Sequence, residues 1–461
     1  MISIDQELLD ILQAYSTPGP RYTSYPTAPI FSSAYDDKRF EIDLITNNHN
    51  NESPLSLYLH IPFCDTLCYF CGCTTVITKD RERIRAYLHA LEKEITRTTA
   101  YVNDDREVVQ LHWGGGTPSY LEPGEIEELH EKIWREYRFR RDAEVSVEID
   151  PRGLTLGHMK AFRAAGVNRI SLGVQDFDER VQRAVHRIQP EEITRQSVTW
   201  ARELGINNIN VDLMYGLPLQ TLSSFQKTLE KVVELSPSRI AVFSFAYVPW
   251  LKPHQMLLHQ EDLPSPQEKL LLLKVAIETL TAAGYEYIGM DHFAKPDDEL
   301  VLARKTRTLH RNFQGYSTHA GADLYGFGMS SISHFGGIYA QNAKTLKEYM
   351  ERVAAKRFPT IAGYRMTPDD HIRKYVIMRL MCDLEVNKKE VETFYRISFD
   401  EYFSEALSQL VEFEQLGLVS HDGDRITVEP NGRLLLRNIA MCFDAHLKRT
   451  DRERPVFSKT I

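Results

Sequence analysis

The sequence predicts an α/β fold in which a parallel β-sheet forms a partial or complete barrel. The prediction depends on an alternation between about residue 55 and residue 290, where short β-branched runs are separated by longer segments of helical periodicity. This pattern is typical of repeated βα units. The chain has 461 residues, of which 43% are hydrophobic and 26% charged. It is long enough for a barrel, and its composition excludes a disordered or membrane-embedded class of protein.

Six strands are expected to form the first part of the sheet, at residues 55–60, 108–112, 144–149, 169–173, 209–213 and 240–245. Amphipathic helices, with apolar residues three or four positions apart, are expected between them at residues 81–99, 126–137, 158–165, 191–204 and 225–235. A further helix is expected at residues 266–283, because a Pro-Ser-Pro segment precedes it and Gly284 ends it. A seventh strand, at residues 285–290, follows this helix.

The two ends of the chain differ from this pattern. Residues 1–50 lack strand periodicity and contain an aromatic, hydroxyl-rich segment at 20–26, so we expect an N-terminal arm that covers the barrel mouth. The barrel domain is expected to span residues 51–355, including a glycine-rich passage near residues 315–337. Residues 356–461 are expected to form a mainly helical C-terminal domain, with helices at 370–384, 388–395 and 403–416 and a hairpin of strands 418–420 and 425–428.

Charge and hydropathy predict a cytoplasmic protein without a nucleic-acid or membrane partner. The chain carries 55 basic and 64 acidic residues, a net charge of -9, which opposes binding to nucleic acid or anionic lipid through bulk charge. Its longest nearly apolar stretch, residues 240–251, is shorter than a bilayer crossing. No basic region followed by an apolar region comes after Met1, so no export signal is expected. We also expect a monomer.

The cysteines indicate a metal centre. Four of the six lie within ten residues, directly after the first expected strand, at Cys64, Cys68, Cys71 and Cys73. Clustered thiolates in a reducing compartment favour zinc or an iron-sulfur cluster. Structural zinc usually takes two separated ligand pairs, and the ferredoxin run is absent, but zinc remains an alternative. Three thiolates on a four-iron cluster would leave one iron open for a ligand. Cys382 and Cys442 lie in apolar helical patterns and are expected to be buried hydrophobes.

Polar and glycine residues follow the other strands, where a barrel builds its active site. Three consecutive glycines, 114–116, and then Thr117 come after the second strand, and their missing side chains would let the backbone approach a ligand. Glu148, Gln175 and Asp212 lie at the ends of the next three strands. Each could instead make a structural hydrogen bond. Arg187 suits a carboxylate, although it could be a surface helix arginine.

The C-x3-C-x2-C motif after the first strand resembles the cluster motif of radical S-adenosylmethionine (SAM) enzymes. Further segments make the chain resemble one family among them, the oxygen-independent coproporphyrinogen III oxidases, along essentially its whole length: PRYTSYPT at 20–27, the extra Cys73, GGGTP at 114–118, RNFQGY at 311–316 and RNIAMCFD at 437–444. The resemblance implies a radical SAM partial (β/α)6-type barrel. It also implies one 4Fe-4S cluster held by Cys64, Cys68 and Cys71, and two SAM molecules.

The activity implied by the resemblance is the anaerobic oxidative decarboxylation of coproporphyrinogen III to protoporphyrinogen IX in heme biosynthesis. A 5′-deoxyadenosyl radical from SAM would abstract a hydrogen from a propionate β-carbon. Loss of carbon dioxide and one electron then leaves a vinyl group, and two propionates react in turn. An electron donor and an electron acceptor, both of unknown identity, are further expected partners. A heme chaperone and a heme-degrading radical SAM relative are the alternatives, and both resemble the barrel without Cys73 and the PRYTSYPT segment.

The resemblance also implies residue roles. The first SAM is expected to contact Tyr58, Gly115, Glu148 and Ile332. The second is expected to contact Phe70, Gly116, Thr117, Gln175, Arg187, Asp212 and Ala246. Phe313 and Gln314 are expected to be needed for activity, and Arg21 and Tyr22 to contact the substrate. Cys73 is expected to be a catalytic residue and not a ligand, because only one residue separates it from Cys71 and the bite on one cluster would be strained.

Overall fold

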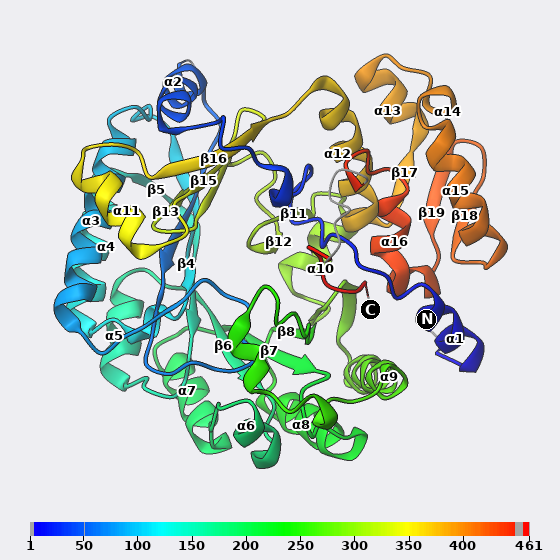
Figure 1. Cartoon of the computed structure of the whole chain (residues 1–461), viewed down its shortest axis with the longest axis horizontal. Coiled ribbons are helices and arrows are strands. Elements are labelled where there is room, and N and C mark those ends of the chain that lie inside the picture. Colours follow the sequence, from blue (N-terminus) through cyan, green and yellow to red (C-terminus); the bar gives the residue numbers. More distant parts are fainter. Residues whose placement is uncertain (1–3, 50, 448–454, 461) are drawn as a thin grey trace.

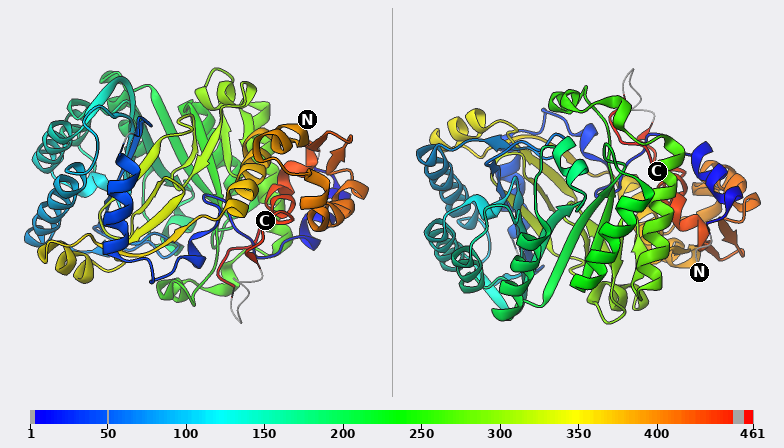
Figure 2. Two further views of the ribbon diagram at one scale, coloured as in Figure 1. Left: turned by 90° about the horizontal axis from the view of Figure 1, so that it is seen from above. Right: turned by 90° about the horizontal axis from the view of Figure 1, so that it is seen from below.

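The main element of the computed structural model, which describes residues 4–49, 51–447 and 455–460, is one large curved sheet. In the described part of the chain this sheet has twelve strands, in the order β16-β15-β14-β13-β1-β4-β5-β6-β7-β8-β10-β9. The helices of the barrel units lie along its outer face, while the C-terminal helices gather at one end (Figure 1, Figure 2). The expected α/β class is therefore confirmed.

The six expected parallel strands form the centre of the sheet. They are β1 (Leu55–Ile61), β4 (Glu107–Gly115), β5 (Arg138–Ile149), β6 (Arg169–Gln175), β7 (Asn208–Tyr215) and β8 (Arg239–Ser244). Each pairs in parallel with the next. The expected helices are α3 (Arg81–Thr99), α4 (Pro123–Glu136), α5 (Leu156–Ala164), α7 (Glu191–Glu203), α8 (Leu222–Leu235) and α9 (Pro266–Ala282). These units confirm the partial (β/α)6 barrel, with a short extra helix, α6 (Glu179–Ala184), after β6.

Strand alternation sends polar residues to the inner face. In β7, Val211 and Leu213 are buried toward the helices, whereas Asp212 between them is only half-buried. Side chains in a strand point alternately to opposite faces, so Asp212 faces the interior of the barrel. By the same register, Asp212 lies beside Ala241 of β8, and Ala241 lies beside His292 of β10 (His292–Ala294).

Residues 323–365, which begin within the glycine-rich passage, form four strands that the sequence analysis did not predict. β13 (Asp323–Phe327) pairs in parallel with β1, and β14 (Ile332–Phe335), β15 (Ile338–Asn342) and β16 (Thr360–Arg365) follow as antiparallel neighbours. β13 is buried along its whole length, so it shows no alternation. A β-carbon on Gly326 would meet the carbonyl oxygen of Ile332 at 2.7 Å, which explains the glycine there.

The edges of the sheet also differ from the expectation. The seventh strand is β9 (Glu286–Gly289), and it pairs antiparallel with β10, which is itself antiparallel to β8. At the opposite edge, β16 continues the sheet past residue 355, where the C-terminal domain was expected to begin. We therefore propose that the boundary follows Arg365. α10 (Glu299–Lys305) and α11 (Leu346–Ala354) complete this region.

The C-terminal region is mainly helical, as expected. Its helices are α12 (Pro368–Asp383), α13 (Lys388–Tyr395), α14 (Phe399–Tyr402), α15 (Ser404–Gln415) and α16 (Leu436–Met441). The expected hairpin of β18 (Val419–His421) and β19 (Arg425–Val428) gains a third strand, β17 (Glu385–Asn387). No helix in the ranges that the structure describes has the length and hydropathy needed to cross a membrane.

The N-terminal arm is part of the core. It contains two helices that were not predicted, α1 (Gln6–Ala14) and α2 (Asp37–Asn48). Between them, the side chains of Tyr22 and Tyr25 have no solvent exposure. They belong to one apolar cluster with residues of β7, β8 and α12. The arm is thus packed between the barrel and the C-terminal region, rather than laid over a finished surface.

Candidate active site

The cysteine loop lies at the carboxyl end of β1. Cys64 ends a short strand, β2 (Phe63–Cys64), which pairs with β3 (Val76–Ile77), so the other three cysteines lie on the intervening loop. Segments from elsewhere in the chain hold this loop. The amide of Tyr69 donates to the carbonyl of Val185 at 3.0 Å, and the side chain of His254 lies 2.8 Å from the carbonyl oxygen of Cys71. The thiols therefore have a fixed place at the barrel mouth.

Cys68 lies beside two guanidinium groups. Arg152 Nη2 is 3.4 Å from its sulfur and Arg187 Nη1 is 3.7 Å from it, and both arginines also pair with Asp150. Two positively charged side chains therefore lie next to the sulfur of Cys68. Cys68 is buried, whereas Cys73 is exposed.

The pKa values of the other two proposed ligands, Cys64 and Cys71, shift in opposite directions. Burial raises the pKa of Cys64 to about 12. A hydrogen bond with the Cys73 side chain lowers the pKa of Cys71 to about 6. Among the described residues, no three His, Cys, Asp or Glu side chains gather around a point suited to a single metal ion. A four-iron cluster needs a wider set, because each thiolate binds a different iron. Three soft thiols with arginines beside them fit such a cluster.

Gly115 and Gly116 allow two chain segments to meet. A β-carbon on Gly115 would lie 2.7 Å from the carbonyl oxygen of Ile61, and one on Gly116 would lie 2.5 Å from that of Pro62. Glycine is thus required at both positions because β4 packs closely against the end of β1. The sequence analysis had not predicted this role. Gly115 has a φ of 123°, which glycine adopts readily. Its amide donates to Glu148 at 3.2 Å.

Two carboxylates and two aromatic rings line the interior below the cysteine loop. His112 Nε2 lies 3.2 Å from Glu148, and the Tyr58 ring stacks on His112 at 5.9 Å. Although burial opposes it, hydrogen bonding from His112 lowers the pKa of Glu148. Burial and the nearby Glu148 charge raise the pKa of Asp212 to about 7. Ser171 donates to Asp212 at 3.0 Å. Glu148 is therefore favoured in its charged form, whereas Asp212 titrates near neutral pH.

Gln175 and Arg187 form the adjoining wall. Gln175 has a φ of 68°, unusual for a residue with a side chain, and its Oε1 is buried without a hydrogen-bond partner. Arg187 is 7% exposed and donates to the carbonyl of Gly173 at 2.7 Å, so the surface-helix alternative is wrong. Its Nε also lacks a partner. Unpartnered polar atoms at the ends of barrel strands are available to a ligand.

The remaining expected second-SAM residues lie around this wall. Thr117 is buried, and its hydroxyl accepts from the amide of Asp150 at 3.1 Å. Phe70 packs in an apolar cluster with Cys68 and Phe245. Ala246 follows β8, and its carbonyl oxygen accepts from Gln255 at 3.1 Å. The expected contacts to the second SAM thus come from β6 and β7, from the segments that follow β4 and β8, from the cysteine loop and, for Arg187, from the loop between α6 and α7.

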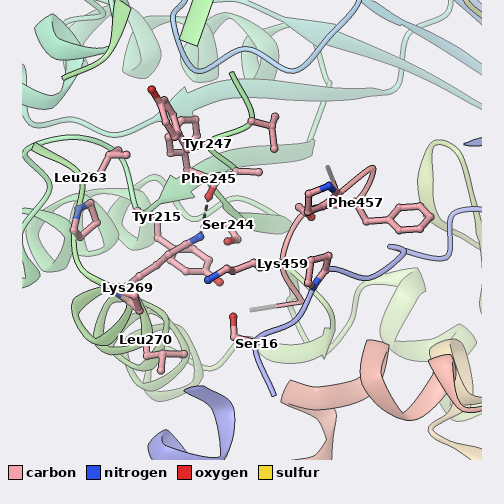
Figure 3. A pocket seen from close by; sticks show the side chains of 18 of the residues that line it. Ser16, Tyr215, Ser244, Phe245, Tyr247, Leu263, Lys269, Leu270, Phe457 and Lys459 are labelled. Atoms are coloured by element: carbon pink, nitrogen blue, oxygen red, sulfur yellow. Dashed lines mark hydrogen bonds between the residues drawn. The ribbon is translucent and has the colours of Figure 1, made fainter. Parts of the chain in front are cut away.

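A pocket of about 490 Å³ opens beside Ala246, at the carboxyl ends of β7 and β8. Figure 3 shows Lys269 reaching toward Phe245, with Lys459 of the C-terminal tail close by. Lys269 Nζ donates to the carbonyl of Phe245 at 2.8 Å. Burial, with the positive charges of Lys459 and Arg437, lowers the pKa of Lys269 to about 8. The pocket combines apolar walls with a cationic end, and it would suit an anionic group.

Comparisons with known proteins agree with this geometry. Residues 58–232 match the Radical SAM superfamily, and residues 366–435 match the HemN C-terminal domain. The chain is 46% identical to the oxygen-independent coproporphyrinogen III oxidase of Escherichia coli strain K12, over 98% of both chains. It is 45% identical to the Synechocystis protein of that name, over 98% of this chain and 97% of the relative. The chain belongs to the oxygen-independent coproporphyrinogen III oxidase family.

A solved structure of this family has the same fold. It is described as "Coproporphyrinogen III oxidase (HemN) from Escherichia coli is a Radical SAM enzyme", and it covers 97% of this chain with 44% identity and a TM-score of 0.91. Membership in the radical SAM superfamily implies a 4Fe-4S cluster and SAM as cofactors. The expected family and enzyme class are thereby confirmed.

The family segment at residues 311–316 forms a hairpin of β11 (His310–Asn312) and β12 (Gly315–Ser317). Phe313 lies at its tip, edge-on to Tyr339 with ring centres 6.0 Å apart. Both amide atoms of Gln314 are buried without partners. Ile332, the last expected SAM residue, is half-buried at the start of β14. The hairpin therefore presents an aromatic ring and an unsatisfied amide.

The two family residues of the arm have different surroundings. Arg21 pairs with Asp291 and lies over the Phe243 ring at 5.8 Å. Tyr22 is fully buried, and its hydroxyl donates to Asp444 at 2.9 Å. The structure thus gives Tyr22 a core position, which disagrees with the expected substrate contact. Arg21 remains a candidate.

Three residues near the site were missed by the sequence analysis: His112, Asp150 and Arg152. Asp150 directly follows β5, so the rule that selected Glu148 at a strand end could have found it. His112 and Arg152 had no comparable signal, because their roles depend on contacts with Glu148 and Cys68.

Proposed function

We propose that this chain is an oxidoreductase that converts coproporphyrinogen III to protoporphyrinogen IX by oxidative decarboxylation of two propionates. The observation that carries the proposal is the 46% identity to a curated coproporphyrinogen III oxidase over 98% of both chains. We propose further that it acts in the cytoplasm as a monomer. Its electron donor and acceptor lie outside the chain.

In this proposal Cys64, Cys68 and Cys71 hold one 4Fe-4S cluster. The bound cluster and SAM supply the one-electron chemistry that yields a 5′-deoxyadenosyl radical. The chain's residues orient the partners and exclude water. Arg152 and Arg187 support the proposal for Cys68, because they place two positive charges beside the sulfur that would bind the cluster.

The SAM contacts are proposed from the family resemblance, and charge supports two of them, Glu148 and Arg187. Glu148, whose pKa is lowered by His112, suits a cationic amino group of the first SAM, beside Tyr58, Gly115 and Ile332. Arg187 suits a carboxylate of the second SAM. Asp212 has a pKa of about 7 and can donate a hydrogen bond in its neutral form. The other proposed second-SAM contacts are Phe70, Gly116, Thr117, Gln175 and Ala246.

Two SAM molecules in one site predict a stoichiometry. Each protoporphyrinogen IX formed is expected to consume two SAM and release two molecules each of 5′-deoxyadenosine, methionine and carbon dioxide. The reason is that two identical chemical events occur on one substrate. The measurement is chromatographic counting of products in a single anaerobic reaction. One 5′-deoxyadenosine per product, or SAM that is regenerated, would contradict the proposal.

Arg21 is proposed to pair with a substrate propionate. Burial and the charges of Arg437 and Arg311 lower the pKa of Arg21 to about 9, although Asp291 already pairs with it. A substrate carboxylate would add a second negative charge beside these arginines. The Arg21→Gln enzyme is therefore expected to show a KM for coproporphyrinogen III raised about tenfold, the cost of one charge-assisted hydrogen bond. Its iron content should be normal.

Kinetic assays of reconstituted enzyme check this expectation, with Arg39→Gln as the control because Arg39 is exposed on α2. An unchanged KM would make Arg21 a packing residue. Deleting residues 1–30 is a poorer test, because it removes Tyr22 and Tyr25 from the core. Loss of a buried aromatic side chain costs about 3–5 kcal/mol, so the truncated chain is expected to unfold.

The proposed function itself is tested with anaerobically reconstituted, reduced protein. Incubation with SAM and coproporphyrinogen III should yield protoporphyrinogen IX, read as its oxidised porphyrin. A heme chaperone would bind heme and form no such product. A heme-degrading enzyme would instead consume heme. A zinc scaffold would lack the brown colour and charge-transfer absorption of an iron-sulfur protein.

A further inference from the structure

Lys374 is a cation without an acidic partner. It lies in α12, and its Nζ is 2.9 Å from His334 Nε2 of β14 and 5.2 Å from the centre of the Tyr339 ring. Within the described ranges, no carboxylate oxygen lies within 4.0 Å of this ammonium. Burial alone lowers its pKa, to about 7. Lys374 is half-buried, and a half-buried charge without a counter-ion is costly, so this site lacks something that a ligand could provide.

The side chains around Lys374 cannot supply a negative charge. Burial, and next the charge of Lys374, lower the pKa values of His310, His334 and His371. Because an ammonium group only donates hydrogen bonds, His334 accepts through Nε2 and is neutral. The nearest acid on the same helix, Asp370, is occupied by His446 at 2.6 Å and by Thr367. Among the described residues, these neighbours therefore offer Lys374 no anion to pair with.

Aromatic rings join this site to the family hairpin. The Tyr339 ring stacks on His334 at 4.4 Å and on Phe31 at 5.5 Å, and Phe313 meets it edge-on. α12 also packs against β11 of the hairpin (Figure 1). Ile332 and His334 are two residues apart on β14, so they share one face of the sheet. The cation therefore lies beside a group of aromatic rings in which Tyr339 is buried and Phe313 is half-buried.

We propose that Lys374 and His334 bind the carboxylate of one substrate propionate, whose pyrrole packs beside the half-buried Phe313. The inference rests on the proposed function, because coproporphyrinogen III carries a propionate on each pyrrole. The subsite joins the barrel extension to the C-terminal region, since His334 is on β14 and Lys374 on α12. It assigns a substrate-binding role to the C-terminal region.

The test compares holoenzymes. Lys374→Met should raise the KM for coproporphyrinogen III about tenfold or more, because a charge-assisted hydrogen bond is lost. SAM cleavage without porphyrinogen and iron content should be unchanged. Lys374→Arg should recover most of the affinity. Lys389→Met is the control: Lys389 is an exposed lysine of the same region that pairs with Asp424, and the KM should not change. An unchanged KM in Lys374→Met would overturn the proposal.

A second readout separates binding from packing. Removing a half-buried charge without a counter-ion should leave the melting temperature equal to or above that of the wild type. Binding of coproporphyrin III, followed by absorbance, should weaken about tenfold in Lys374→Met, while binding of its tetramethyl ester should change less than about twofold. A lower melting temperature with equal losses for both ligands would overturn the proposal. If the wild type binds coproporphyrin III more tightly than Lys374→Met does but forms no protoporphyrinogen, only the proposed function is refuted.

Discussion

Replacing Cys64, Cys68 or Cys71 singly by Ala is expected to remove most of the bound iron and all cleavage of SAM. The reason is that two thiolates cannot retain a four-iron cluster well. Cys68 should be the most sensitive position, because its loss also leaves Arg152 and Arg187 facing a small cavity. Iron analysis, the visible spectrum and 5′-deoxyadenosine formation are the measurements.

Cys442→Ala is the matched control for this series. Cys442 is half-buried, its sulfur lies 3.6 Å from the carbonyl oxygen of Asn438, and it is far in sequence from the cluster loop. Its variant should keep full iron and activity. Full iron with normal SAM cleavage in any one of the three ligand variants would refute the ligand assignment. Exposure to oxygen should inactivate the wild type, since no fourth thiolate protects the open iron.

The Cys73→Ser enzyme is expected to keep normal iron content and a normal cluster spectrum, yet to form protoporphyrinogen about 10²-fold more slowly, the usual loss for a proton donor in catalysis. Cys73 is exposed on the cluster loop, whereas the buried Cys68 lies between two arginines. Serine preserves size and hydrogen bonding and removes thiol chemistry. The assay therefore isolates what the sulfur contributes.

Two outcomes would change this assignment. Loss of iron in Cys73→Ser would make Cys73 a cluster ligand and would contradict the open-iron argument. Full activity would reduce Cys73 to a packing role. Thr74→Ser is a useful neighbour control, because the Thr74 carbonyl, and not its side chain, holds His60 at 3.0 Å. That control should behave like the wild type in both iron content and turnover.

Local signals in the sequence were sufficient for the barrel and for the cysteine loop. β1 and β6–β8 follow the predicted β-branched runs to within two residues at each end, and β5 differs by starting earlier, at Arg138, in an exposed stretch. Such runs can be recognised in the sequence because the residues that favour a strand are neighbours in the chain. Cys64, Cys68 and Cys71 are also close in sequence, so their shared loop needed no tertiary information.

The tertiary structure alone decided the rest. β13 pairs with β1 across more than 260 positions of the sequence, and its uniform burial shows no period to detect. Tyr22 became a core residue because Asp444 meets it. Arg187 became an inner-wall residue because Asp150 and Cys68 surround it. Lys374 contacts the imidazole of His334, which is 40 positions away in the sequence, so its surroundings could not be predicted from its neighbours in the chain. Periodicity records each residue's own preference for water, whereas burial and charge pairing depend on partners that only the folded chain brings together.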